Sequence, residues 1–377
     1  MAHACADAGV IETARDAAKA KRYARVRARG DAVRGDARRR GARARARTNA
    51  LTRAPLCVAR IARDIAELGY VDDAYARSFV TPARGAAHGR RHPPLVHRGY
   101  WARASATRAT VSAFAASTTS DSVDVPVNIV NIGAGFDTIA MYAHGAMRGK
   151  VRVVELDHGE VVKGKMSRLR AAPDAERALG ADEDLTNVRS TREDSGVMYT
   201  IGTAYALVEC DVRDVERVEK VLVRSGIDLS APTLVLAECV LAYLPPGKSN
   251  EIVRWFGERV RTGVFMSYDP IGPDDAFGRT MMRNVESRGC AFSGIYDAPD
   301  VASAARRFTA NAWSRAEAYD MNTIYSEKLD PVERARIERI EWFDEFEEWR
   351  LIMGHYCISL GVNGLKTFDA FASASSS

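Results

Sequence analysis

Residues 130–138 read VNIGAGFDT and follow the apolar run that begins at residue 127. Gly133 and Gly135 would let the chain turn tightly at the end of a strand and approach a ligand closely. The G-x-G-x-x-G/A pattern of dinucleotide sites needs a small residue at position 138, where this chain has Thr138. No G-K-[ST] of a phosphate loop follows. The stretch therefore predicts a strand-to-helix turn, with or without a ligand, and does not favour a dinucleotide or a triphosphate.

Apolar segments and helical segments alternate downstream of this turn. Such alternation is typical of a parallel sheet with helices on both faces. Strands are expected at 127–133, 151–157, 206–211, 233–243, 263–269 and 355–362. Helices are expected at 56–80, 101–114, 137–148, 214–225, 247–262, 275–288, 301–311 and 331–352. The polar, poorly periodic residues 173–197 are predicted to be an insertion.

The positive charge of the chain is concentrated at its N-terminus. Residues 1–50 hold 14 Lys and Arg against 5 Asp and Glu, whereas the whole chain holds 54 against 49. The remainder is therefore slightly acidic, which does not favour a nucleic-acid substrate. We expect residues 1–50 to be a disordered Ala/Arg-rich extension and the protein to be cytoplasmic, with an organelle transit segment as the alternative. No apolar run is long enough for a membrane-spanning helix.

The expected second and third strands each end in a carboxylate. Asp157 lies 22 residues after Gly135 and could accept hydrogen bonds from both hydroxyls of a ribose, with Glu155 as its nearest competitor and helix capping as the alternative. Asp211 could accept from an adenine amino group while the backbone N–H of Val212 donates to the ring. The alternative role for Asp211 is to cap the helix that begins near residue 214.

Glu238 stands alone inside the apolar run LVLAECVLAY (234–243). A buried, unpaired carboxylate costs several kcal/mol, so Glu238 needs a partner. That partner is either a cationic ligand or a nearby Arg. Together with Asp157 and Asp211, this residue indicates a nucleoside that carries a positive centre and no pyrophosphate, and S-adenosylmethionine matches that description.

Several segments resemble the leucine carboxyl methyltransferase family, in order, from about residue 56 to 361. They include RGYWARAS (98–105), VNIGAGFDT (130–138), VVELD (153–157), ECDVRD (209–214) and LAECVLAYLPP (236–246). The resemblance implies an α/β, Rossmann-like S-adenosylmethionine-dependent methyltransferase fold, with a mostly parallel seven-stranded sheet and a helical lid. It also implies methylation of the C-terminal leucine carboxylate of the protein phosphatase 2A catalytic subunit. The implied divisions are an extension at 1–50, a lid at 51–125, a methyltransferase domain with insertions at 126–365 and a flexible tail at 366–377.

The same resemblance assigns roles to residues of this chain. It implies that Arg103 binds the methionine carboxylate of the cofactor and that Glu238 lies near the methionine. Gly133 would lie beneath the cofactor, Asp157 would hold the ribose, and Asp211 with Val212 would hold the adenine. Tyr243 would line the substrate side. The family usually has a second carboxylate contact, a Lys, where this chain has Ala62. Arg60 or Arg63 could replace it, or could simply lie on a solvated helix face.

A leucine carboxylate is already ionised at pH 7, so we expect neither a catalytic triad nor a metal in the reaction. The histidines show no H-E-x-x-H or other ligand spacing. Phe277, Met281 and Met282 are candidates for the leucine pocket, or else are residues of the hydrophobic core.

The alternatives left open are a carboxyl methyltransferase that acts on a hypermodified tRNA guanosine or on a small-molecule acid, and a non-catalytic cofactor-binding protein. The tRNA branch of the family carries a C-terminal β-propeller, which is not expected here. A monomer is expected.

Overall fold

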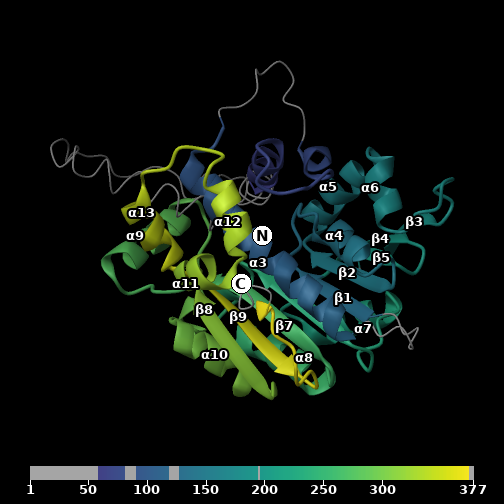
Figure 1. Ribbon diagram of the computed structural model, residues 1–377. Helices are drawn as coiled ribbons and strands as arrows, with labels where there is room; N and C mark the ends of the chain where they lie inside the picture. Colours follow the sequence, from purple (N-terminus) through teal and green to yellow (C-terminus); the bar gives the residue numbers. More distant parts are fainter. Residues whose placement is uncertain (1–57, 81–90, 119–126, 194–195, 373–377) are drawn as a thin grey trace, which may run out of the picture.

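The structure, a computed structural model, describes residues 58–80, 91–118, 127–193 and 196–372 (Figure 1). Its centre is a nine-stranded sheet in the order β3-β4-β5-β2-β1-β6-β7-β9-β8. The strands are β1 (Val127–Ile132), β2 (Val151–Asp157), β3 (Val188–Glu193), β4 (Gly196–Ile201), β5 (Tyr205–Glu209), β6 (Thr233–Glu238), β7 (Gly263–Pro270), β8 (Arg315–Asp320) and β9 (Tyr356–Asn363). The five strands from β5 to β7 are parallel, whereas β9 and the β3–β4 hairpin pair antiparallel with their neighbours.

Helices cover both faces of the sheet because its parallel strands are apolar on both sides. Along β1 the side chain of Ile129 enters one core and that of Val130 enters the other. The first face is covered by α3 (Pro94–Thr118), α4 (Ile139–Ala146) and α5 (Gly159–Arg170), and the second by α7 (Val215–Arg224), α8 (Lys248–Arg259) and α10 (Val301–Thr309). This arrangement confirms the predicted α/β class and the mostly parallel sheet.

The chain reverses its direction of sheet growth beside β1. From β1 it adds β2 and then β5 on one side, and it later adds β6 and β7 on the other. Ligands of doubly wound sheets bind outside the carboxyl ends of the strands at such a point. The turn at 133–135 therefore lies where a ligand is expected.

The sheet has nine strands rather than the seven predicted. The predicted insertion at 173–197 contains α6 (Pro173–Ala178) and β3, and β3 pairs with β4 to form an antiparallel hairpin on the edge of the sheet. The residues of β3 read VRSTRE and are largely exposed, so no apolar run reveals the strand. β8 was also missed, because its residues read RAEAYD, contain no apolar run and are all half-buried.

Two predicted helices are broken. The N-terminal one is helical over residues 58–67, stops at Gly69, whose φ is +81°, and is followed by the short η1 (Ala76–Phe79). Left-handed φ values suit glycine and end helices. The predicted helix at 331–352 is divided into α12 (Pro331–Ile337) and α13 (Phe346–Met353). α3, in contrast, extends well beyond the 101–114 predicted for it.

The ends of the chain differ in how far the structure describes them. The predicted extension at 1–50 lies outside the described residues. Of the predicted flexible tail at 366–377, residues 366–372 are described, and Phe368 and Phe371 are buried in the first core. The backbone carbonyl of Phe368 also accepts a hydrogen bond from Arg315 at 2.7 Å. This part of the tail is thus packed against β8. Within the described residues no helix is long and apolar enough to cross a membrane.

Candidate active site

The glycine turn after β1 is tied to the neighbouring strand β2. The backbone N–H of Gly133 donates to Leu156 O at 2.7 Å, and that of Gly135 donates to Asp157 Oδ2 at 2.8 Å. Both glycines have left-handed φ, +69° and +54°. A Cβ at Gly133 would lie 2.5 Å from Val240 Cγ2, whereas one at Gly135 would meet nothing within 4 Å. Gly133 is therefore required both by its backbone conformation and by the close approach of Val240.

Asp157 and its competitor Glu155 have different surroundings. Asp157 also accepts from the backbone N–H of His158 at 2.6 Å and lines a cavity. Glu155 is fully buried, 2.6 Å from Lys165 Nζ and 2.7 Å from the hydroxyl of Tyr205. Because Glu155 is held inside the core, Asp157 is the carboxylate of β2 that faces the site.

A cavity of about 790 Å³ lies at the carboxyl ends of β1, β2 and β5. We call it the strand-end cavity. It brings together five of the residues that the sequence singled out: Gly133, Asp157, Asp211, Val212 and Tyr243. Its place at the carboxyl ends of the strands and its carboxylates suit the hydroxyls and amino group of a nucleoside.

Asp211 is not the cap of the following helix. Asp214 is the N-cap of α7, where its side chain accepts from Arg217 N. Asp211 instead accepts from the backbone N–H of Arg213 at 3.0 Å and from its Nε at 2.8 Å. The hydrogen bond from the Arg213 side chain lowers the pKa of Asp211 to about 2. The residue is thus an anionic acceptor at neutral pH.

A second, smaller cavity lies on the other side of the glycine turn. We call it the lid cavity, because its lining includes Val58, Ala62 and Ile65 of the helical residues 58–67. It is also lined by Gly135, Asp137, Arg103 of α3 and Glu238 at the end of β6. The turn therefore stands between two cavities, with Gly133 lining one and Gly135 the other.

An ion pair crosses the lid cavity. Arg103 Nε donates to Glu238 Oε2 at 2.6 Å, and both side chains are buried. The guanidinium carbon of Arg103 also lies 4.8 Å from the centre of the Tyr268 ring. Burial raises the pKa of Glu238, and the charge and hydrogen bond of Arg103 act against that rise. Of the two partners considered for Glu238, the structure shows the Arg.

The structure does not bring Arg60 or Arg63 to the place of the missing Lys. Ala62 lines the lid cavity, whereas Arg60 is exposed. Arg63 donates to Asp64 Oδ1 from both Nε and Nη2, at 3.1 and 2.6 Å. Asp137, which the sequence analysis did not single out, does line the lid cavity and accepts from Asn131 at 3.0 Å. Its position inside the VNIGAGFDT stretch is the signal that could have found it.

A third cavity adjoins Arg103 on its apolar side. We call it the apolar cavity, and its lining includes Ile61, Leu95, Val96, Ile352 and Met353 as well as Arg103. The three residues proposed for a leucine pocket do not line it. Phe277 and Met281 are buried in the first core, and Met282 packs against that core. Their helical spacing in α9 (Ala276–Ser287) reflects core packing.

Comparison with known proteins identifies the family of this chain. Residues 40–257 match the family model of leucine carboxyl methyltransferase. The chain belongs to the leucine carboxyl methyltransferase family. It is 38% identical over 296 residues to a leucine carboxyl methyltransferase 1 homolog of Arabidopsis thaliana, an alignment that covers 78% of this chain and 83% of that one.

Two other relatives differ in the activity that their names state. A human tRNA wybutosine-synthesizing protein 4 is 35% identical over 80% of this chain, but only 42% of that longer protein is covered. Leucine carboxyl methyltransferase 1 of Bos taurus is 28% identical, with 79% of this chain and 85% of that one covered.

Family and fold together make this chain an S-adenosylmethionine-dependent methyltransferase, which confirms the predicted fold class and cofactor. The donor set fits that cofactor. The strand-end cavity offers Asp157, Asp211 and a backbone N–H to a nucleoside. The lid cavity offers the guanidinium groups of Arg103 and Arg108, together with carboxylates, to a zwitterionic amino-acid end.

Proposed function

We propose that this methyltransferase esterifies the C-terminal leucine carboxylate of the protein phosphatase 2A catalytic subunit. The observation that carries the proposal is the apolar cavity beside Arg103. Its aliphatic lining from Leu95, Val96 and Met353 suits a leucine side chain. Because Arg103 lines both this cavity and the lid cavity, an acceptor there would lie next to the methionine end of the cofactor.

In this proposal the cofactor spans both sides of the glycine turn. Asp211 and the N–H of Val212 hold the adenine, and Asp157 holds the ribose. Arg103 binds the methionine carboxylate and Glu238 its amino group, so that the ligand shares the ion pair that joins the two side chains. Tyr243, whose ring centre lies 4.8 Å from that of Phe292, forms a wall of the strand-end cavity and helps to position the ligands.

The chain has to position the reactants rather than activate them. The cofactor supplies an electrophilic methyl group on a sulfonium. The acceptor carboxylate is already ionised at pH 7, so no general base is required. Holding the reacting atoms about 3–3.5 Å apart and in line can lower the barrier by roughly 7–11 kcal/mol. The reaction also neutralises opposite charges, so a site that excludes water favours it over the hydrated reactants.

The helical residues 58–67 act as the lid that excludes water. Val58, Ala62 and Ile65 place apolar or small side chains on the cavity that Arg103 and Glu238 line. Limited proteolysis in the 58–80 region should therefore slow when S-adenosylhomocysteine is added. A cleavage rate that is independent of this ligand would contradict the closing role.

A second candidate acceptor is a hypermodified tRNA guanosine, because the human wybutosine-synthesizing relative is 35% identical to this chain. An apolar cavity favours leucine over a nucleoside side chain, whose polar groups would lose hydrogen bonds there.

The test uses methyl-labelled S-adenosylmethionine with three acceptors in parallel. They are intact phosphatase 2A, the same phosphatase lacking its last leucine, and tRNA carrying the unmethylated wybutosine precursor. The proposal predicts base-labile label on the intact phosphatase alone. Label on the tRNA alone would overturn it in favour of the second candidate.

A further inference from the structure

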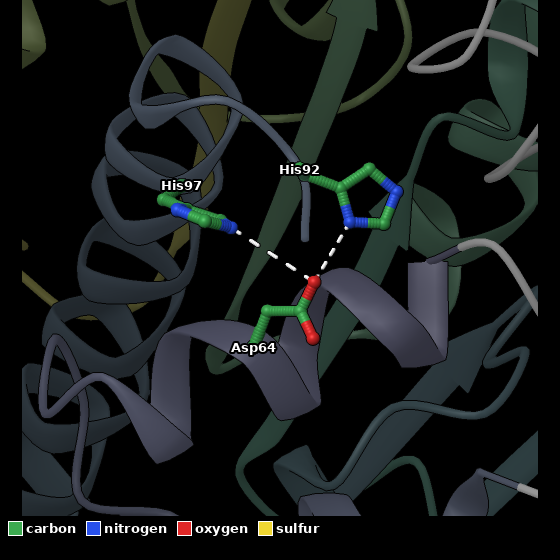
Figure 2. Close-up of side chains that lie close together, drawn as sticks. All are labelled: Asp64, His92 and His97. Atoms are coloured by element: carbon green, nitrogen blue, oxygen red, sulfur yellow. Dashed lines mark hydrogen bonds and ion pairs between the residues drawn. The ribbon is translucent and has the colours of Figure 1, made fainter. Parts of the chain in front are cut away.

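Outside the cavities described above, three potential metal ligands meet beneath the lid (Figure 2). Asp64 comes from the helical residues 58–67, His92 lies two residues before the start of α3, and His97 lies in the first turn of α3. One ligand atom from each lies within 4.8 Å of the other two. The sequence analysis found no ligand spacing because Asp64 is 28 residues from His92.

Both histidines point to the same carboxylate oxygen. His92 Nδ1 is 2.9 Å and His97 Nε2 is 3.9 Å from Asp64 Oδ2, as the dashed lines in Figure 2 show. Two bonds of about 2.0 Å at a tetrahedral zinc hold ligand atoms about 3.3 Å apart, and the two distances lie on either side of that value. His97 is fully buried, Asp64 is 2% exposed and His92 is 22% exposed, so the cluster has one solvent-facing side.

The tautomer of His97 directs a lone pair at Asp64. Its Nδ1 lies 2.7 Å from Glu341 Oε2, and a carboxylate accepts, so this nitrogen carries the hydrogen. In the neutral imidazole Nε2 is then an acceptor. Within the described residues it makes no hydrogen bond. A carboxylate that holds the far nitrogen of a histidine is also the usual arrangement around metal-bound histidines.

Two buried acceptors that face each other are stabilised by a proton or a metal ion between them. Asp64 is 2% exposed, and Arg63 Nη2 lies 2.6 Å from its Oδ1. Arg63 supplies positive charge at Oδ1 only and leaves Oδ2 to the histidines. The remaining cation is either a proton on His97 or a metal ion.

We propose that Asp64, His92 and His97 bind a divalent transition metal, with Zn²⁺ favoured by two imidazoles and one carboxylate. A water molecule would complete the tetrahedron on the exposed side of His92. The ion takes no part in methyl transfer. It joins the lid helix to α3, on which Arg103 lies six residues beyond His97, and so stabilises the wall of the lid cavity.

The test uses the untagged full chain, stripped with dipicolinate and titrated with Co²⁺ as a coloured probe for Zn²⁺. We expect one equivalent to bind with the visible absorption of a tetrahedral site. The variant His92→Ala, which alters a partly exposed side chain, should weaken binding more than tenfold. Glu341→Gln should weaken it about 10–100-fold, because Glu341 orients His97 and is not itself a ligand of the ion. The control His158→Ala, an exposed histidine elsewhere, should bind as the wild type does.

Thermal unfolding gives a second measure that does not depend on enzyme activity. Zn²⁺ should raise the melting temperature of the wild type and of His158→Ala, but not that of Asp64→Asn or His92→Ala. The absence of saturable binding at one equivalent would overturn the proposal and assign the cluster to a proton on His97. Equal binding by the wild type, Asp64→Asn and His92→Ala would overturn it as well.

Discussion

The two sides of the glycine turn are built in different ways. The strand-end cavity is formed by the ends of adjacent parallel strands, and its key carboxylate, Asp157, is already held by two backbone N–H groups. The lid cavity depends on Arg103 and Glu238, which are 135 residues apart in the chain and come from a helix and a strand. The strand-end cavity is therefore formed by the sheet itself, whereas the lid cavity is held together by the ion pair between Arg103 and Glu238.

This difference has consequences for stability and for binding. Substitution of a side chain at a strand end should lower mainly the affinity for the ligand. In the lid cavity, the same ion pair holds the fold together and receives the ligand, so removing one partner should affect both. The predictions below test that contrast, beginning with the largest expected effect.

The largest effect is expected from Arg103→Ala. It leaves Glu238 buried without its cation, and an uncompensated buried charge costs about 3–5 kcal/mol in the free energy of unfolding. Denaturant unfolding measures the loss. The matched double variant, Arg103→Met with Glu238→Gln, has no buried charge at this pair and should regain most of that stability without regaining cofactor binding. If Arg103→Ala were as stable as the wild type, the ion pair would not be what holds the lid cavity together.

Next is Gly133→Ala, where the new Cβ would lie 2.5 Å from Val240 Cγ2 at a φ of +69°. Steric overlap and backbone strain together should cost about 2–4 kcal/mol in the free energy of unfolding. Gly135→Ala is the control, because its Cβ meets nothing within 4 Å and only the strain of about 1 kcal/mol remains. Equal losses for the two variants would contradict the role given to Val240.

Asp157→Asn should weaken ligand binding by about 1.5–3 kcal/mol, since it removes a charged acceptor from the ribose. The loss should be the same for S-adenosylhomocysteine and for 5′-methylthioadenosine, which lacks the amino-acid end. Calorimetry measures both. Glu160→Gln, which lines the same cavity and pairs with Lys163, should change neither affinity.

The smallest effect concerns pH. The pKa of Asp211 is depressed to about 2, so its contribution as an anion is complete above the usual carboxyl range and is lost only as pH falls through about 2. Titration of Asp211 should therefore change the affinity for S-adenosylhomocysteine less than about twofold between pH 7 and 5. In Arg213→Ala the pKa of Asp211, followed by NMR, should return toward about 4. An unchanged pKa in that variant would show that Arg213 is not the cause.

The same contrast explains what the sequence could predict. Apolar strands and the residues that follow them revealed the parallel sheet, Asp157 and Asp211, because strand ends converge wherever such a sheet forms. The partner of Glu238 remained open between a ligand and an Arg, since no local pattern fixes a contact between α3 and β6. The polar hairpin strand β3 and the burial of Phe371 were missed for the same reason: tertiary packing, rather than local periodicity, places them.

The most direct test of the two-sided site compares two ligands in one conservative variant. Arg103→Lys keeps the positive charge but loses the planar fork that binds carboxylates bidentately. Calorimetry should show that it weakens S-adenosylhomocysteine at least tenfold and leaves 5′-methylthioadenosine, which has no carboxylate, unchanged. Equal weakening of both ligands, or of neither, would contradict the assignment of Arg103 to the methionine end.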